Sequence, residues 1–175
     1  TAIVLGRGGK PELELYLDVC LNDGVPIIRR RGGGGTVVLD PGNVIVSAIA
    51  QAPGVGDIKL HYRRMLDWLR RGLIDAGIEK VGFNGISDLV IGEKKICGTS
   101  LYRPKNWLYF TASLLVTPDL SLIDRYLQHP PREPEYRAGR PHGDFLTTLA
   151  EHSDFVSAGD LKAAMAAALP TTLSE

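Results

Sequence analysis

The chain has 175 residues, enough to bury the core of one domain but too few for two domains of typical size. Its 20 basic residues balance its 20 acidic ones, which argues against strong nonspecific binding to nucleic acid or membranes. No apolar run is long enough to span a bilayer, no signal segment opens the chain, and the only cysteines are Cys20 and Cys97. We therefore expect one domain over residues 1–175, in a soluble cytoplasmic protein.

The first fifty residues predict short strands around one helix. The apolar side chains of residues 11–22 suit either a helix or a strand, but Pro11 near the start and Asp23-Gly24 at the end favour a helix. Apolar, β-branched runs between glycine and proline turns predict strands. These strands are expected at residues 2–5, 25–29, 36–40 and 44–50.

A run of arginines and glycines joins two of these strands. Arg29-Arg30-Arg31 is followed directly by the four glycines of residues 32–35. Glycine tolerates positive φ and lets backbone N–H groups approach an oxyanion, while arginine offers a planar fork of donors. The run therefore suits an anionic ligand, although an isolated glycine run is more often a simple hairpin or bulge.

The remainder of the chain predicts further strands and two longer helices. Apolar residues recur at spacings of three and four over residues 55–76, which indicates an amphipathic helix with a core-facing stripe. The short apolar runs 88–91 and 95–98 flank Gly92-Glu93-Lys94, a hairpin pattern. The other expected elements are a strand at 107–116, a short helix capped by Thr117-Pro118-Asp119 and ending at Leu127, an irregular proline-rich connector at 129–143, and a helix at 157–168.

This order of elements predicts an α+β fold, with helices packed on a mixed β-sheet. Two ordered motifs then carry a resemblance to a known family. The first contains Arg29-Arg30, the glycines, Asp40, Gly42-Asn43 and Ser47, and the second runs from Ser87 through Gly92-Glu93-Lys94-Lys95-Ile96-Cys97-Gly98 to Thr99. Together they resemble the catalytic domain of the lipoate-protein ligase A family, in the biotin/lipoate protein ligase superfamily. The similarity continues through Leu114–Leu120.

The resemblance implies a fold, a reaction and a set of partners. In the family, lipoic acid or a related medium-chain acid is activated by ATP, normally with Mg²⁺, to an acyl-adenylate. The acyl group then passes to a lysine of a lipoyl carrier domain, of the 2-oxoacid dehydrogenase E2 or glycine cleavage H protein type. Many relatives use a small C-terminal domain for adenylation. We expect this chain to lack it, and a separate accessory chain to supply it.

The resemblance also assigns site residues. Lys95 matches the family's essential lysine, whose ammonium group would stabilise negative charge on the acyl carbonyl and phosphate oxygens. Outside such a motif, a hairpin lysine is usually a solvated surface residue. Substrate or nucleotide binding falls to Arg30, Gly33, Gly34, Gly35, Thr36, Val37, Asn43, Asp88, Gly98 and Thr99.

Several of these assignments have structural alternatives. Arg30 would hold either the glycine loop or the acyl-adenylate. Asn43 and Asp88 would either orient the nucleotide or metal end of the ligand or form Asx turns. Gly98 and Thr99 would either approach the α-phosphate or simply end a strand.

Two other functions remain open from the sequence. Octanoyl and lipoyl transferases use a cysteine thioester and no ATP, but where they place their cysteine this chain has Gly82 or Leu108. Cys97 remains a candidate thiol, because strand alternation would place it on the same face as Lys95. A noncatalytic lipoate-binding subunit is the second alternative. The four histidines show no metal-site spacing, so no metal ligands are assigned.

Overall fold

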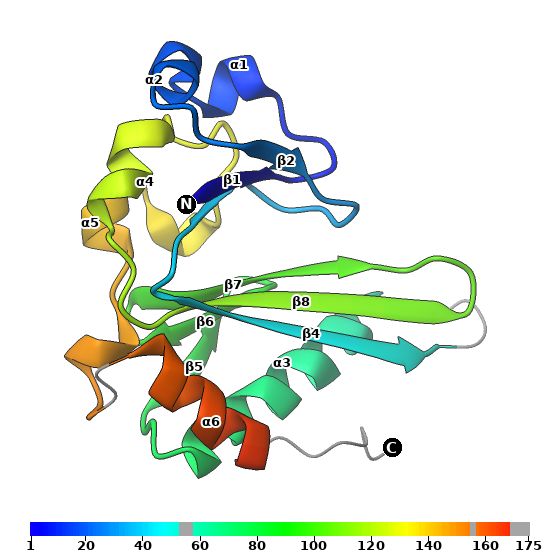
Figure 1. Ribbon diagram of the computed structural model, residues 1–175. Coiled ribbons are helices and arrows are strands. Elements are labelled where there is room, and N and C mark those ends of the chain that lie inside the picture. Colours follow the sequence, from blue (N-terminus) through cyan, green and yellow to red (C-terminus); the bar gives the residue numbers. More distant parts are fainter. Residues whose placement is uncertain (53–57, 155–156, 169–175) are drawn as a thin grey trace.

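The structure of the protein is a computed structural model that describes residues 1–52, 58–154 and 157–168. It consists of two β-sheets, one above the other in Figure 1. Helices α1 and α2 lie above the small upper sheet, and helices α3 and α6 lie below the large lower sheet. The segment that contains α4 and α5 forms a side wall between the two layers (Figure 1). This arrangement places the upper face of the large sheet opposite the small sheet.

The small sheet has the strand order β2-β1-β3. Its central strand β1 (Ala2–Leu5) pairs parallel with β2 (Ile27–Arg29) and antiparallel with β3 (Val37–Leu39). All three strands were predicted, with somewhat longer bounds for the last two. A separate hydrophobic core lies between this sheet and helices α2 and α4. Its buried members are Ile3, Leu5, Leu15, Cys20, Val38, Ile123, Tyr126 and Leu127.

The large sheet has the strand order β4-β8-β7-β6-β5, and every neighbouring pair is antiparallel. The glycine and proline turns of the sequence separate these strands, as the turn chemistry predicts. Tight turns place β6 beside β7 and β7 beside β8, so Asp88, Gly98 and Ser113 lie in a row across the sheet. The strands are β4 (Asn43–Gln51), β5 (Val81–Asn84), β6 (Asp88–Ile91), β7 (Lys94–Tyr102) and β8 (Trp107–Leu115).

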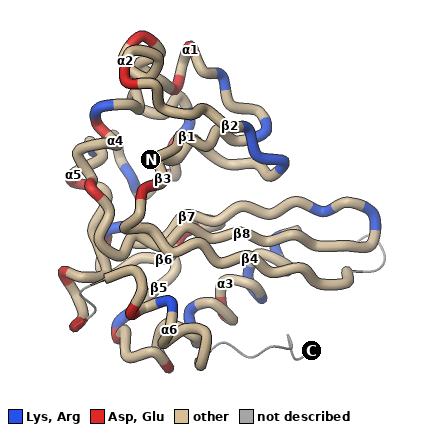
Figure 2. The backbone as a smooth tube through the Cα atoms, in the orientation of Figure 1, with Lys and Arg blue, Asp and Glu red and all other residues tan. Residues whose placement is uncertain are grey.

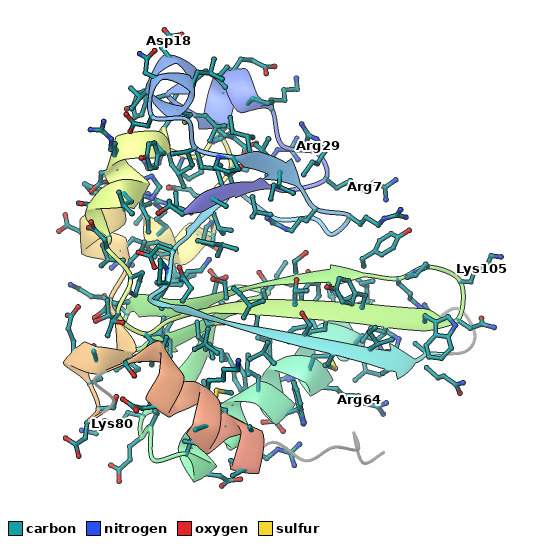
Figure 3. All side chains as sticks on the ribbon, viewed as in Figure 1. Arg7, Asp18, Arg29, Arg64, Lys80 and Lys105 are labelled. Carbon is teal, nitrogen blue, oxygen red and sulfur yellow. The ribbon has the colours of Figure 1, made fainter. Side chains whose placement is uncertain are left out.

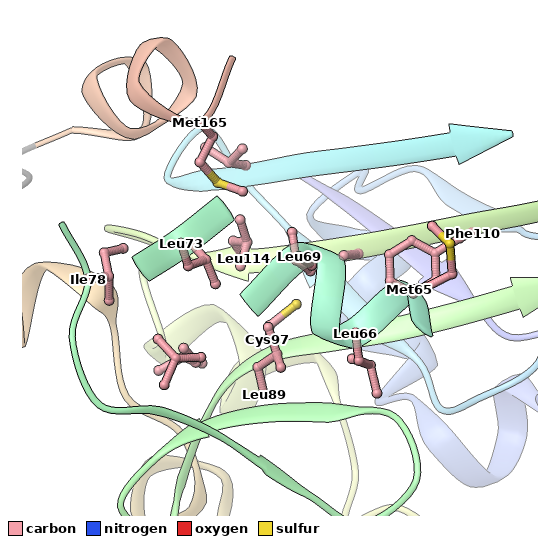
Figure 4. Close-up of a cluster of buried hydrophobic side chains, with 14 of the residues drawn as sticks. Met65, Leu66, Leu69, Leu73, Ile78, Leu89, Cys97, Phe110, Leu114 and Met165 are labelled. Carbon is pink, nitrogen blue, oxygen red and sulfur yellow. The ribbon is translucent and has the colours of Figure 1, made fainter. Parts of the chain in front are cut away.

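The main core lies between the large sheet and helices α3 (Ile58–Asp75) and α6 (Ala158–Ala168). The stripe of α3 that the sequence predicted, which includes Leu69 and Leu73, packs against Phe110 and Leu114 of β8 (Figure 4). Leu69 and Leu73 are fully buried, and truncation of such a leucine to alanine typically costs about 2–5 kcal/mol. The helix was expected to begin at residue 55, but residues 55–57 lie outside the described part.

The helix predicted at residues 11–22 is wrong in one respect, because two short helices occupy this segment. α1 (Pro11–Glu14) ends where Leu15 forms a β-bridge with Leu127, and α2 (Leu17–Asn22) follows. The backbone amide of Tyr16 donates to Tyr126 O over 2.9 Å, and that of Gln128 donates to Glu14 O over 3.0 Å. These bonds use the backbone groups that a continuous helix would need.

Three further differences concern the second half of the chain. Strand β5 was missed, since its sequence Val-Gly-Phe-Asn carries no alternation, and β7 is longer than the predicted 95–98. The connector at 129–143 is not wholly irregular. It contains the 3₁₀ helix η1 (Glu135–Arg137) and the start of α5 (His142–Phe145), before a second 3₁₀ helix, η2 (Leu149–Glu151). The predicted short helix is α4 (Ser121–Tyr126), and Asp119 Oδ1 accepts a 3.0 Å hydrogen bond from its first amide.

Candidate functional site

The polar centre of the molecule is formed by Asp88, Lys95 and Tyr136, which we name the site trio. Lys95 Nζ lies 2.9 Å from Asp88 Oδ1, and the Tyr136 hydroxyl donates to Asp88 Oδ2 over 2.9 Å. Asp88 is only 5% exposed, whereas the Lys95 side chain is 23% exposed. Polar contacts in such a partly buried position are stronger than on the surface, because water competes less. The trio therefore presents an ordered ammonium group to its surroundings.

A β-bulge in β7 directs Lys95 to the face of the sheet that opposes the small sheet. Leu89 pairs with Cys97 but Val90 pairs with Lys95, so Ile96 has no partner in the register. Ile96 and Cys97 both belong to the core below the sheet. An extra residue in one strand reverses which face each side chain before it occupies, relative to the residues after it. The bulge thus places Lys95, rather than Lys94, on the same face as Gly98.

The predicted residues Gly98 and Thr99 flank this lysine in different ways. A Cβ atom on Gly98 would lie 3.2 Å from both Cε and Nζ of Lys95, so the absence of a side chain gives the lysine room to lie across the strand. The Thr99 hydroxyl donates to Ser87 O over 2.7 Å and fixes the start of β6. Both residues line a cavity, as described below.

The glycine loop is held in place by Arg30. Its guanidinium group donates to Val4 O over 3.1 Å, to Gly33 O over 2.8 Å and to Gly35 O over 2.7 Å. Burial lowers the pKa of Arg30, and electrostatic interactions with Tyr62 and Glu14 act in the opposite sense. Carbonyl oxygens take up most of the guanidinium donors, so Arg30 performs the first of its two predicted roles, the organisation of the loop.

The loop also packs against the large sheet. Gly34 adopts a φ of +91°, which favours glycine, and the Ser100 hydroxyl of β7 donates to Gly33 O over 3.1 Å. A Cβ atom on Gly32 would collide with Ser100 Oγ, and one on Gly6 would collide with Gly34 O. Gly6 and Gly32 are therefore needed for the close packing of the loop.

Two cavities meet at Asp88 and Lys95. The larger has a volume of about 540 Å³ and extends toward α4, α5 and the connector, and the smaller has about 270 Å³ and extends along the glycine loop toward Tyr102 and Tyr109. Lys95 and Asp88 line both cavities. The other residues that line both are Gly35, Thr36, Val37, Ser87, Gly98 and Ser113.

The surroundings of the smaller cavity are positively charged. No Asp or Glu occurs between residues 24 and 39 or between residues 94 and 118, and these segments carry seven Lys or Arg. Figure 2 shows basic residues at the β2 end of the small sheet and at the β7–β8 turn. In Figure 3, Arg7 and Arg29 extend from the upper layer and Lys105 extends from the lower layer at the same end of the molecule. A cavity with this charge favours an anionic ligand.

Most of the predicted site residues are brought together, and one is not. Arg30, Gly34, Gly35, Thr36, Val37, Asp88, Lys95, Gly98 and Thr99 line one or both cavities, and Gly33 lies in the loop between Arg30 and Ser100. Asn43 is not among the cavity residues. Its Oδ1 accepts a 2.8 Å hydrogen bond from the Asp40 amide, so Asn43 organises the turn before β4. The Asx turn in this segment is formed by Asp40, whose Oδ1 accepts from the Gly42 amide over 2.8 Å.

The expected position of Cys97 is wrong. Cys97 lies in the main core beside Leu89, on the face of the sheet opposite Lys95 (Figure 4), because the bulge interrupts the alternation. Burial raises the pKa of this thiol to about 12, although the Lys95 charge lowers it. A buried, protonated thiol is a poor nucleophile. The geometry disfavours the cysteine-thioester alternative at this position.

Sequence reasoning missed the contribution of the connector to the site. Tyr136 bonds to Asp88, Phe145 packs against Tyr136 with ring centroids 5.1 Å apart, and both Arg137 and His142 line the larger cavity. The only sequence signal was the presence of aromatic and basic residues in a segment otherwise rich in proline. The hydrogen bond from this segment to β6 and its bridge to β7 could not be read from local patterns.

Two classes of feature are not found in the described part of the chain. None of the described helices combines the length and apolar character needed to cross a membrane. Within the same residues, no group of three or more His, Cys, Asp or Glu side chains is arranged to hold a metal ion.

The fold and site agree with comparisons to known proteins. The family model of the lipoyl protein ligase A/B catalytic domain matches residues 1–170. The match covers almost the whole chain, and the chain belongs to this family. The lipoate-protein ligase of Streptococcus pyogenes is 29% identical over 129 residues, which cover 73% of this chain and 37% of that protein. The chain spans about a third of the length of the curated relatives it matches.

Solved structures confirm the predicted fold. The bipartite lipoate protein ligase of Thermoplasma acidophilum, studied together with its E2 lipoyl domain, superimposes with a TM-score of 0.81 at 24% identity, over 95% of this chain and 65% of that chain. A lipoate-protein ligase A bound with ATP gives a TM-score of 0.75 at 25% identity, over 94% of this chain and 65% of that chain. The α+β architecture of lipoate ligases is thus the architecture of this chain.

Proposed function

We propose that this chain is the catalytic domain of a lipoate-protein ligase, a single domain over residues 1–175. It activates lipoic acid or a related medium-chain acid with ATP, transfers the acyl group to a lysine of a lipoyl carrier domain, or performs both steps. The family match supports the reaction class. The names of the relatives support lipoate as the acid, and the bound ATP of one structural neighbour supports the nucleotide.

The observation that carries this proposal is the position of Lys95 where two cavities meet. An acyl-adenylate has an acyl arm and a nucleotide arm joined at one mixed anhydride, so it suits two cavities with a common wall. The Lys95 ammonium would lie beside that anhydride. The carbonyl and phosphate oxygens gain negative charge during both half-reactions, and a pre-positioned cation stabilises that charge.

The chemistry follows in two steps. In the first, a carboxylate oxygen of the acid attacks the α-phosphorus of ATP, and pyrophosphate leaves. In the second, the neutral amine of the carrier lysine attacks the acyl carbon, the amine loses a proton, and AMP leaves as the amide forms. Lys95 acts in both steps as a charge-stabilising hydrogen-bond donor. The glycine loop would bring backbone amides close to the bound anhydride.

Magnesium would be bound largely through the substrate. Mg²⁺ usually takes one or two carboxylates together with phosphate oxygens and waters. Asp88 is the one carboxylate among the described residues that line both cavities, and its two oxygens keep acceptor capacity beyond the bonds to Lys95 and Tyr136. This carboxylate fits the role of a single protein ligand. The ion would supply further charge stabilisation at the phosphates.

The partners in this proposal are a carrier protein and an accessory chain. A lipoyl domain of the 2-oxoacid dehydrogenase E2 or glycine cleavage H protein type would present the acceptor lysine. A separate polypeptide would contribute to the adenylation step. The bipartite ligase of Thermoplasma acidophilum and its E2 lipoyl domain support both expectations by analogy. The cytoplasm is the proposed compartment, on the strength of the cysteine and charge content of the sequence.

The test is mass spectrometry of a purified lipoyl domain after incubation with this chain. One reaction contains lipoic acid, Mg²⁺ and ATP, and a parallel reaction contains preformed lipoyl-adenylate. A mass increase in both reactions would demonstrate a complete ligase. An increase only with the adenylate would assign activation to an accessory chain. An unmodified carrier in both reactions, with the accessory chain also added, would contradict the proposed function.

A further inference from the structure

Tyr136 reaches the site from a segment that is distant in sequence. Its hydroxyl donates to Asp88 Oδ2 over 2.9 Å, while Asp88 Oδ1 contacts Lys95 Nζ over the same distance. Asp88 is 48 residues from Tyr136 and almost fully buried. Each oxygen of this carboxylate therefore has a different partner, and Tyr136 is the one that lies outside the large sheet.

The segment that carries Tyr136 is also fixed to the backbone around Lys95. Arg140 Nη2 donates to Tyr136 O over 2.8 Å and to Glu93 O, in the turn before β7, over 3.2 Å. Lys95 pairs with Leu146 in a parallel bridge, and the Thr147 amide donates to Lys95 O over 3.1 Å. The residues from η1 to Thr147 thus contact Lys95 through both its backbone and its ion-pair partner.

Packing determines the orientation of the Tyr136 ring. The centroid of its ring lies 5.1 Å from that of Phe145, which is 3% exposed. Arg137 Cζ lies over the Phe145 ring, 4.9 Å from its centroid. Gly85 has a φ of +59°, and a Cβ atom there would lie 3.5 Å from the Tyr136 ring. Burial, and then the charge of Asp88, raise the pKa of Tyr136, so its hydroxyl stays protonated and acts as a donor.

We propose that Tyr136 is a positioning residue for acyl transfer. It holds the Asp88 carboxylate in the orientation that keeps the Lys95 ammonium where the two cavities meet. This role rests on the proposed function, since it assumes that Lys95 acts on an acyl-adenylate. Tyr136 acts through Asp88, so its loss displaces the ammonium without removing the charge, and small displacements of a catalytic group reduce rates substantially.

The test compares two matched tyrosines. Tyr126 donates to Asp23 Oδ2 over 2.9 Å in a second tyrosine–aspartate–cation group between α2 and α4, and none of its three members lines either cavity. We expect Tyr136→Phe to reduce kcat for transfer from preformed lipoyl-adenylate about tenfold, the equivalent of one hydrogen bond, with KM for the carrier unchanged. Tyr126→Phe should leave kcat unchanged. Each of the two variants loses one hydrogen bond to a carboxylate, so both should lower the melting temperature by a similar amount.

A double-mutant cycle separates positioning from a general structural role. In an Asp88→Asn background, Tyr136→Phe should have little further effect on kcat, because the residue through which it acts has already been altered. An unchanged kcat in the single variant, or an undiminished effect in the Asp88→Asn background, would overturn the proposal.

A second readout is independent of enzymatic activity. Peptide mass spectrometry can follow acetylation of the native chain by an N-hydroxysuccinimide ester, with Lys162 as the internal reference. Tyr136→Phe should accelerate acetylation of Lys95 relative to the wild type, and Tyr126→Phe should not. Equal Lys95 rates in all three proteins would refute positioning, whereas a wild-type chain that modifies no carrier even with the accessory chain added would refute the proposed function alone.

Discussion

Two groups in this molecule each combine a tyrosine, an aspartate and a cationic side chain, and their surroundings differ. Asp23, Arg125 and Tyr126 form a surface trio, and Asp88, Lys95 and Tyr136 form the site trio. In the surface trio the Asp23 and Arg125 side chains are 25% and 53% exposed, against 7% and 23% for Asp88 and Lys95. Both tyrosines donate to their carboxylates over 2.9 Å. The chemical groups alone therefore do not define the site.

The difference lies in the cation and in what adjoins it. Arg125 uses Nε and Nη2 on the two oxygens of Asp23, at 2.7 and 2.9 Å, and this fork joins α2 to α4. Lys95 makes a single contact with its carboxylate and lines both cavities. An ammonium group has three donors, so it retains capacity for a ligand. The surface trio joins two helices, whereas the site trio holds a cation whose remaining donors face the cavities.

The strongest test of this comparison removes each cation in turn. Lys95→Ala should reduce acyl transfer from lipoyl-adenylate about 10²–10³-fold, because the group that stabilises charge in the transition state is lost. Arg125→Ala should retain wild-type transfer. Single-turnover kinetics on both variants, after circular dichroism has shown that they are folded, provides the measurement. A Lys95→Ala variant that binds the carrier and still transfers at the wild-type rate would identify another catalytic group.

A second test displaces the lysine without replacing it. Gly98→Ala would place a methyl group 3.2 Å from Lys95 Nζ, so we expect the side chain to shift and transfer to fall about tenfold or more. Gly82→Ala is the matched control, since its Cβ would lie 3.5 Å from Val90, which is ordinary contact. If both alanine variants had equal activity, the space above Gly98 would be irrelevant to the position of Lys95.

Changes to the surface trio should alter the free energy of unfolding rather than the rate of acyl transfer. Hydrogen bonds from Arg125 and then from Tyr126 lower the pKa of Asp23 below its usual value of about 3.9. A lowered pKa in the folded state stabilises the protein above the unfolded pKa, and this contribution is lost as the pH falls through the folded pKa. Asp23→Asn should therefore flatten the decline in the free energy of unfolding below about pH 4. Urea unfolding at several pH values measures this slope, and parallel curves for the two proteins would contradict the expectation.

The smallest effect is expected for Cys97. Its thiol is buried and its pKa is raised to about 12, so iodoacetamide should not label it in the folded chain at pH 8 but should label it after denaturation. Cys97→Ala should leave transfer unchanged and cost about 1 kcal/mol in the free energy of unfolding. Rapid labelling of native Cys97, or loss of transfer in the variant, would revive the thioester mechanism.

Local patterns predicted the strands that carry the site but not all of its geometry. The hairpin of β6 and β7 was read from two apolar runs and a glycine turn, and it places Asp88 near Lys95. The resemblance assigned roles to both residues. The bulge at Ile96 was not predictable, because apolar residues on both sides of it fit regular alternation equally well. That one extra residue decides that Lys95 and Cys97 lie on opposite faces.

Contacts between distant segments were the other feature that the sequence could not show. Leu15 interrupts the predicted first helix because its neighbours bond to residues 126–128, more than a hundred positions away. Tyr136 joins the site through a contact across 48 residues, and nothing in the pattern around it indicates a strand or a long helix. Local propensity describes elements, whereas tertiary hydrogen bonds decided both of these cases.

The two separate hydrophobic cores have a consequence for how the protein opens. Each core belongs to one sheet, so the two layers are expected to exchange their amide hydrogens as distinct cooperative units. The walls of both cavities come from both layers, with Thr36 and Val37 above and Gly98 and Ser113 below. A bound acyl-adenylate would touch both and stabilise only the closed arrangement. Hydrogen exchange of the two layers would then slow together, because the ligand would couple the opening of one layer to that of the other.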